Sequence, residues 1–175
     1  ANMKYPNEVY NNGLAYGYPM EYAYGTLVLW TMDESIVPSM DSLVNGNIQH
    51  IAVANPKTAP YGAAAMEVLA FYDLYERTKK KLVYGESIAQ TNQFIVSRSA
   101  EIGFTSKSVV LSPKMRGKGR WIELADHTYS RIDQGVVRVK RKNADADAAK
   151  QFYDFLFSGD AHQVLKDFGY LVPEQ

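Results

Sequence analysis

Three short segments of the chain place backbone amides and hydroxyls where they can bind an anion. The first comprises residues 54–62 (ANPKTAPYG), which predict the end of a strand, a loop with two prolines and the start of a helix. A helix N-terminus has unpaired N–H groups and the positive end of the helix dipole, so it favours a negative ligand. Pro60 suits this position because its missing N–H would be unpaired there. Gly62 would let a ligand approach the backbone. An ordinary strand-to-helix connection is the alternative interpretation.

Residues 86–88 and 105–108 form two further corners of this kind. Each follows a short predicted strand, and Ser87 is a suitable N-cap for the helix that begins at Ile88. In open α/β sheets ligands bind beyond the carboxyl ends of the strands, where helices begin. Several uncharged donors at such corners can hold a tetrahedral oxyanion by charge-assisted hydrogen bonds, each helix terminus contributing roughly 0.3–2 kcal/mol.

Strands and helices alternate along most of the chain, which predicts an α/β fold with a largely parallel sheet. The segment from Tyr22 to Thr31 is apolar enough to be buried on both faces. The other expected strands are residues 49–54, 82–84, 101–105, 121–124 and 134–140. The expected helices are a weak one in residues 1–13, a short one in 39–44, and longer ones in 61–81, 88–97, 144–157 and 158–168.

Composition limits the function more than it defines it. The 175 residues, 46% of them hydrophobic, suffice for one large domain or two small lobes. Nineteen basic residues balance nineteen acidic ones, so no overall charge favours nucleic acid or an anionic membrane. The absence of cysteine excludes disulfides, thiolate metal sites and a cysteine nucleophile. No stretch is long enough to span a membrane, and no signal peptide is visible, as expected of a cytosolic, mature or trimmed chain.

No pattern typical of catalysis is present, and we expect a protein that is not an enzyme and has no resident metal or cofactor. His50, His127 and His162 lack partners at metal-ligand spacing and are expected on the surface or in packing. No nucleophile elbow or dinucleotide fingerprint occurs. The basic loop of residues 112–120 is expected to be solvated. Six tyrosines before residue 25 are expected to be half-buried rather than to form a sugar-binding or partner surface.

The sequence resembles the periplasmic molybdate-binding proteins of ABC transporters over most of its length. This family has the type-2 periplasmic binding protein fold, with two lobes that each contain a mostly parallel sheet flanked by helices. The segments that carry the resemblance are LVLW (27–30), IAVANPKTAPYG (51–62), LVYGESIAQ (82–90), EIGFTSKS (101–108), QGVVRVK (134–140), AAKQFYDFLFS (148–158) and VLKDFGY (164–170). The resemblance implies capture of molybdate or tungstate outside the cytoplasm and delivery to a membrane permease.

The resemblance also implies which groups bind the oxyanion. They are the backbone N–H groups of Tyr61 and Ile88 and the hydroxyl of Ser106, where some family members have a tyrosine. Weaker candidates are Gly62, Ser87 and Ser108. Lobe closure would use a hinge near Leu29 and Val136 in the two crossing strands.

The chain departs from the family pattern at its beginning, where the opening strand and two ligand-bearing serines are missing. We therefore expect an N-terminally truncated first lobe, made of residues 1–31 and 131–175, and a second lobe of residues 32–130. Apolar surface exposed on the first lobe would favour association. The alternatives are an oxyanion-sensing effector domain of a transcription regulator, a binding protein for another tetrahedral oxyanion such as sulfate or phosphate, and an enzyme that uses the same cleft.

Overall fold

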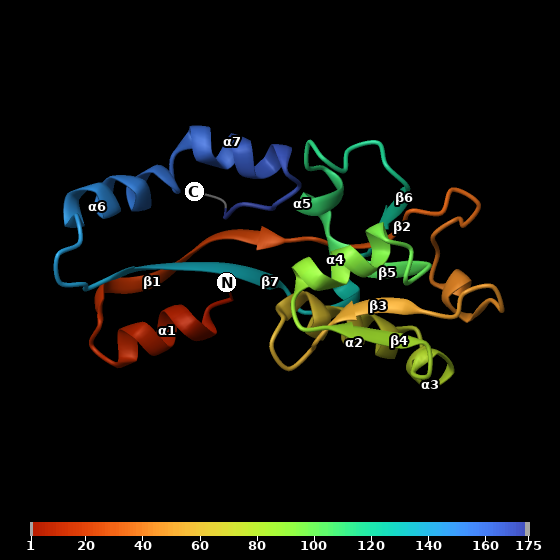
Figure 1. Cartoon of the computed structure of the whole chain (residues 1–175). Coiled ribbons are helices and arrows are strands. Elements are labelled where there is room, and N and C mark those ends of the chain that lie inside the picture. Colours follow the sequence, from red (N-terminus) through yellow and green to blue (C-terminus); the bar gives the residue numbers. More distant parts are fainter. Residues whose placement is uncertain (1, 174–175) are drawn as a thin grey trace. The chain divides into compact units, whose positions relative to one another are not determined.

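A computed structural model describes residues 2–173 and divides the chain into two compact units (Figure 1). Unit 1 comprises Ala1–Gly25 and Ile132–Gln175, and unit 2 comprises Thr26–Arg131. The first boundary lies earlier than the expected residue 31, because β2 (Leu27–Thr31) pairs with strands of unit 2. Leu29 is fully buried within that sheet. A hinge near Leu29 and Val136 stays a prediction.

Unit 2 contains a five-stranded sheet in the order β4-β3-β5-β2-β6. Strand β3 (Ile51–Ala54) is parallel to its neighbours β4 (Leu82–Gly85) and β5 (Ile102–Ser106). Strand β2 is antiparallel to β5 and to β6 (Arg120–Glu123). Four strands therefore run in one direction and β2 alone is reversed, in agreement with the expected α/β class.

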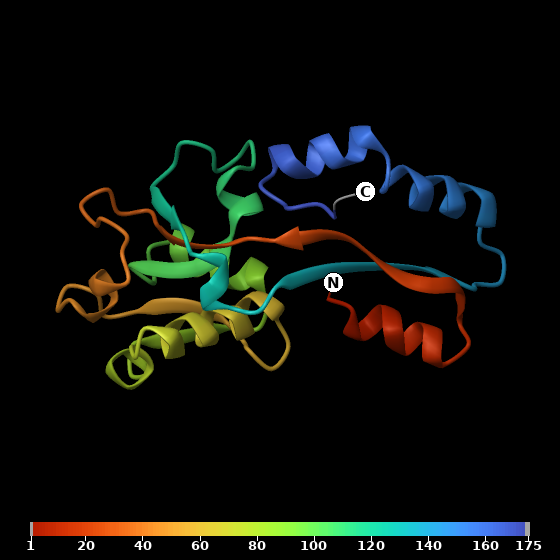
Figure 2. The same ribbon diagram turned by 180° about the vertical axis from the view of Figure 1, so that it is seen from behind.

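Helices cover both faces of this sheet. Helix α4 (Ile88–Val96) lies in front of it in Figure 1, and α2 (Pro60–Phe71) lies in front in the reverse view of Figure 2. Two short helices, α3 (Tyr75–Thr78) and α5 (Lys107–Val110), and two 3₁₀ turns, η1 (Asp41–Val44) and η2 (Asp126–Thr128), complete the unit.

The single helix predicted for residues 61–81 is wrong, because α2 ends at Phe71. Asp73 has a left-handed backbone, with φ 53°. Its amide donates to Ala70 O at 3.1 Å, and the amide of Leu74 donates to Leu69 O at 2.8 Å. This pair of bonds is a Schellman motif, which satisfies the last carbonyls of α2 and turns the chain away from the helix axis.

The core of unit 2 is built around β2, whose five residues are all buried as predicted. Trp30 is fully buried and packs with Val28, Ala52 and Ile95. Its indole N–H donates to Lys118 O at 3.2 Å, so burial of the ring leaves no unpaired donor. Side chains on both faces of β2 thus hold the sheet between its helices.

Unit 1 is an antiparallel ribbon of β1 (Ala15–Gly25) and β7 (Ile132–Val139), with helices α1 (Lys4–Asn11), α6 (Ala146–Phe155) and α7 (Gly159–Asp167). The last helix matches its prediction, since Ser158 caps it and Gly169 follows it with φ 77°. No helix among residues 2–173 is long and apolar enough to cross a membrane.

Unit 1 exposes many large apolar side chains. Of the six early tyrosines, Tyr10, Tyr22 and Tyr24 are half-buried as expected, whereas Tyr5, Tyr16 and Tyr18 are exposed. The other exposed side chains of this kind are Leu14, Met20, Val139, Phe152, Phe155, Val164, Phe168 and Leu171. Association through this surface stays a prediction.

Candidate functional site

The three predicted corners lie at one edge of the unit 2 sheet. Strands β3, β4 and β5 are neighbours and parallel, with Ala54 opposite Gly85 and Ala52 opposite Gly103. Their carboxyl ends therefore meet at the same edge, and α2, α4 and α5 follow from there. The topology thus brings the segments of Tyr61, Ile88 and Ser106 to a common edge, as the sequence predicted.

Backbone hydrogen bonds tie the first corner to the second. The amide of Asn55, just after β3, donates to Gly85 O at 2.7 Å, and the amide of Ala59 donates back to Asn55 O at 2.8 Å. The amide of Lys57 donates to the Asn55 side-chain oxygen at 3.1 Å, which closes an Asx turn. These bonds position Tyr61 in the first turn of α2, directly after Pro60.

Gly62 has a packing role that the sequence did not predict. Its amide donates to Ala59 O at 2.9 Å, so this donor is used within the helix start. A methyl group on Gly62 would lie 2.0 Å from the carbonyl oxygen of Ala54. The glycine therefore allows the close packing of α2 on the end of β3, and the approach of a ligand to it stays a prediction.

The second corner is a well-formed helix start. Ser87 has extended backbone angles, and its Oγ accepts a hydrogen bond from the amide of Gln90 at 3.3 Å. The Gln90 side chain in turn accepts from the amide of Glu86 at 2.7 Å, an arrangement close to a capping box. Within residues 2–173 the amide of Ile88 has no hydrogen-bond partner. Ile88 thus offers a donor at the positive end of α4, and the Ser87 hydroxyl can still donate.

The third corner brings two serine hydroxyls together. Ser106, the last residue of β5, is 6% exposed, and its Oγ lies 3.0 Å from the Oγ of Ser108. Since one hydroxyl of such a pair donates to the other, the second O–H can donate to a further acceptor. The neighbouring Lys107 ammonium lies 2.5 Å from the Glu123 carboxylate, so its charge is paired.

The sequence does not predict Tyr129 as a site residue, although its hydroxyl reaches the edge of the sheet where the three corners lie. Its hydroxyl oxygen accepts a hydrogen bond from the amide of Leu27 at 3.1 Å, and Leu27 is paired with Ser106. Burial raises the pKa of the Tyr129 phenol, so the hydroxyl keeps its proton at neutral pH. Tyr129 and Leu27 are far apart in sequence, and nothing in the local pattern indicates this contact.

Two of the three histidines each lie near a single carboxylate. His50 Nδ1 lies 3.6 Å from a Glu101 carboxylate oxygen, and His127 Nδ1 lies 3.9 Å from Asp126. In the described part of the chain no group of three or more acidic, histidine or cysteine side chains could hold a metal ion. The donors at the three corners are uncharged N–H and O–H groups, which can bind an anion through charge-assisted hydrogen bonds.

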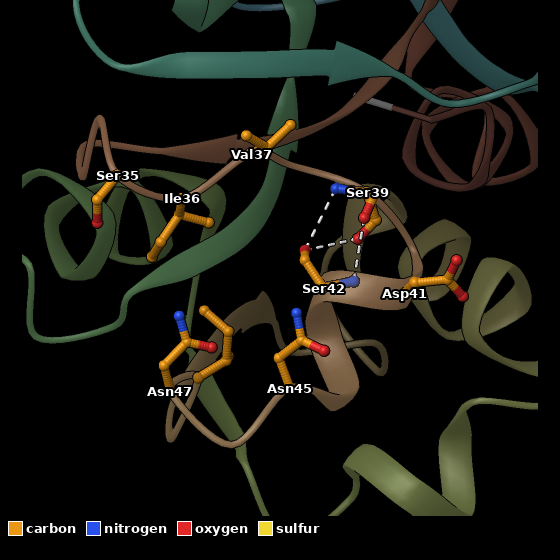
Figure 3. Close-up of a pocket in the computed structure, with 9 residues that line it drawn as sticks. Ser35, Ile36, Val37, Ser39, Asp41, Ser42, Asn45 and Asn47 are labelled. Carbon is orange, nitrogen blue, oxygen red and sulfur yellow. Dashed lines mark hydrogen bonds between the residues drawn. The ribbon is translucent and has the colours of Figure 1, made fainter.

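A separate cavity of about 290 Å³ lies in the loop before β3, at the opposite edge of the sheet (Figure 3). The side chains of Asn45 and Asn47, labelled in Figure 3, are among those that line it. Ser39 Oγ accepts from the amide of Ser42 at 3.1 Å, and Ser42 Oγ donates to Ser39 O at 2.7 Å. These hydroxyls stabilise the turn, and none of the predicted site residues lines this cavity.

The chain is similar to a known protein family, to curated relatives and to solved structures. Residues 1–171 match the family described as bacterial extracellular solute-binding protein. The chain is 36% identical over 173 residues to a molybdate-binding protein ModA of Rhodobacter capsulatus and 41% identical over 160 residues to that of Azotobacter vinelandii. These alignments cover 98% and 90% of this chain but 67% and 63% of the relatives, so the chain spans about two thirds of their length. The solved periplasmic molybdate-binding protein of A. vinelandii superposes with a TM-score of 0.89 at 28% identity, over 99% of this chain and 77% of that one.

Proposed function

Because the chain belongs to the bacterial extracellular solute-binding proteins, we propose that it captures molybdate outside the cytoplasm for uptake by an ABC transporter. The names of the two curated relatives and of the solved structure support molybdate as the ligand. Tungstate belongs to the proposal because it is also a doubly charged tetrahedral oxide. A membrane permease is the proposed partner that receives the anion.

One observation carries the proposal: three uncharged donor groups follow three neighbouring strands at one edge of the unit 2 sheet. The proposed donors are the amides of Tyr61 and Ile88 and the hydroxyl of Ser106. Gly62 stays a weaker candidate, since its amide already donates to Ala59 O. Ser87 and Ser108 stay weaker candidates, since their hydroxyls cap α4 and pair with Ser106.

Such a donor set selects its ligand by protonation and by size. A fully ionised oxyanion only accepts hydrogen bonds, so each oxygen can face an N–H or O–H. A protonated anion such as hydrogen phosphate would turn one O–H toward a donor and lose that hydrogen bond. Sulfate is fully ionised but smaller, so fixed donors would not reach all its oxygens at normal hydrogen-bond distances.

Calorimetric titration and thermal melting of the full chain with four anions test this function. Molybdate and tungstate should bind saturably and raise the melting temperature, while sulfate and phosphate should do much less. Replacement of Ser106 by alanine should weaken molybdate binding roughly tenfold, the effect of one hydrogen bond to a charged ligand. The matched control is Ser35→Ala, at an exposed serine that bonds Asp33 at 2.7 Å. Equal responses to all four anions, or equal losses in both variants, would contradict the proposal.

A further inference from the structure

The guanidinium of Arg138 in unit 1 lies over two tyrosine rings. Its central carbon lies 5.8 Å from the ring centre of Tyr16 and 5.5 Å from that of Tyr153. Tyr16 is opposite Arg138 in the β1–β7 ribbon, whereas Tyr153 comes from α6, which packs beside β7 (Figure 1). Contacts from two elements therefore restrict the orientation of this side chain.

The donors of this guanidinium are not used by the described part of the protein. Among residues 2–173, the guanidinium of Arg138 forms neither a hydrogen bond nor an ion pair, and neither does that of Arg141, whose backbone carbonyl accepts from the amide of Ala144. Arginine has five N–H donors in a planar fork and no acceptor. That fork matches the two oxygens of a carboxylate, which it can bind through two parallel hydrogen bonds.

Arg138 and Arg141 line a cavity of about 40 Å³ beside the first turn of α6. The space is larger than one water molecule requires and can receive one small functional group. Much of its remaining wall is apolar, formed by Val139, Ala144, Ala146 and Ala149.

One acidic residue also lines the cavity. Asp145 is the N-cap of α6, and its carboxylate accepts a hydrogen bond from the amide of Ala148 at 2.9 Å. Its negative charge repels a doubly charged anion about twice as strongly as a singly charged one. The first turn of α6 is therefore capped, and the side chains with donors that line this cavity are Arg138, Arg141 and Tyr16.

We propose that this cavity binds a carboxylate group carried on an apolar stem, with Arg138 as the principal ligand. The carboxylate would face the guanidinium fork, and the stem would lie against the alanine and valine side chains. Phosphate or molybdate would fit less well, because their oxygens point in all directions and some would face apolar wall without a donor. The site is distinct from the three corners of unit 2 and does not depend on their function.

The carboxylate can belong to a free organic acid or to a polypeptide, and the experiment separates these sources. The Nε–H signal of Arg138 in the ¹⁵N-labelled full chain is followed by NMR during titration with acetate, butyrate, phosphate, molybdate, and a Gly-Gly-Leu peptide with a free or amidated C-terminus. Butyrate should bind saturably and more tightly than acetate, by up to about fourfold for each added methylene. If the peptide binds more tightly than butyrate, and if amidation of its C-terminus abolishes binding, the carboxylate ligand belongs to a polypeptide.

Variants test the role of the guanidinium. Arg138→Gln should abolish carboxylate binding, observed by calorimetry and by the signal of Arg141, and Arg138→Lys should weaken it about tenfold because the planar fork is lost. Arg77→Gln, at an arginine of α3 in unit 2, is the matched control and should change nothing. The proposal is overturned by no saturable response to any carboxylate, by an undiminished response in Arg138→Gln, or by tighter binding of phosphate or molybdate at Arg138. The melting-temperature shift with molybdate should be the same in Arg138→Gln as in the unmodified chain, which keeps this test separate from that of the three corners.

Discussion

Replacement of Gly62 by alanine should destabilise unit 2 and weaken anion binding together. The added methyl group would lie 2.0 Å from the carbonyl oxygen of Ala54 and 2.7 Å from its carbonyl carbon. Both are backbone atoms, so α2 must shift. Overpacking of this kind costs about 1–3 kcal/mol, and contact with backbone favours the upper end. Alanine recovers up to about 1 kcal/mol through its higher helix propensity. The expected net loss is about 2 kcal/mol, or a melting temperature lower by roughly 4–8 °C for a chain of this size.

Thermal and urea unfolding of both proteins would measure this loss. Gly159→Ala is the matched control, because Gly159 also lies in the first turn of a helix and has no atom within 4 Å of the added methyl group. The control should be as stable as the unmodified chain or slightly more stable. If Gly62→Ala behaved like Gly159→Ala, the packing argument for the first corner would be refuted. Retained stability with lost molybdate binding would instead favour direct contact between Gly62 and the ligand.

Two further predictions concern single side chains of unit 2. Ser87→Ala removes the N-cap of α4 and should lower the free energy of unfolding by about 1 kcal/mol, measured by urea titration; an unchanged midpoint would contradict the capping role. Burial raises the pKa of Glu101, but hydrogen bonds from the amides of His50 and Gln49 outweigh this, so its pKa is lowered from 4.5. The ionised carboxylate thus stabilises the fold above pH 4.5, and this contribution is lost as the pH falls through the lower folded-state value. Glu101→Gln should therefore melt below the unmodified chain at pH 7, and the difference should disappear in acid; a gap that persists at low pH would contradict this.

The positions of the three corners could be predicted because each depends on local signals. Pro60, Ser87 and the short apolar strands mark where helices begin, and parallel neighbours must place those starts at one edge. The close approach of Gly62 to Ala54 could not be predicted, since a glycine near a helix start is equally typical of ligand contact. Tyr129 was missed because its contact with Leu27 joins residues 102 positions apart.

Two errors in the secondary structure have local causes. The sequence predicts no strand before Tyr22, yet β1 begins at Ala15. Gly17 and Pro19 are typical of loops, but here they occupy a register irregularity between Tyr16 and Met20, where the ladder with β7 is interrupted. The end of α2 was missed because an aspartate takes the left-handed position that glycine usually marks.

The reversed direction of β2 has a consequence for how the chain folds. Because β2 runs against its neighbours, the first and last parts of unit 2 meet: the amide of Leu124 donates to Leu27 O at 3.1 Å. Unit 2 is thus one uninterrupted stretch that needs no residue outside it to complete its sheet. Unit 1 joins distant segments, and Lys140 Nζ reaches Gly13 O across 127 positions. The entropic cost of closing so long a loop is smallest once the residues within it are already compact. During synthesis, unit 2 should therefore fold first and the β1–β7 ribbon of unit 1 should pair last.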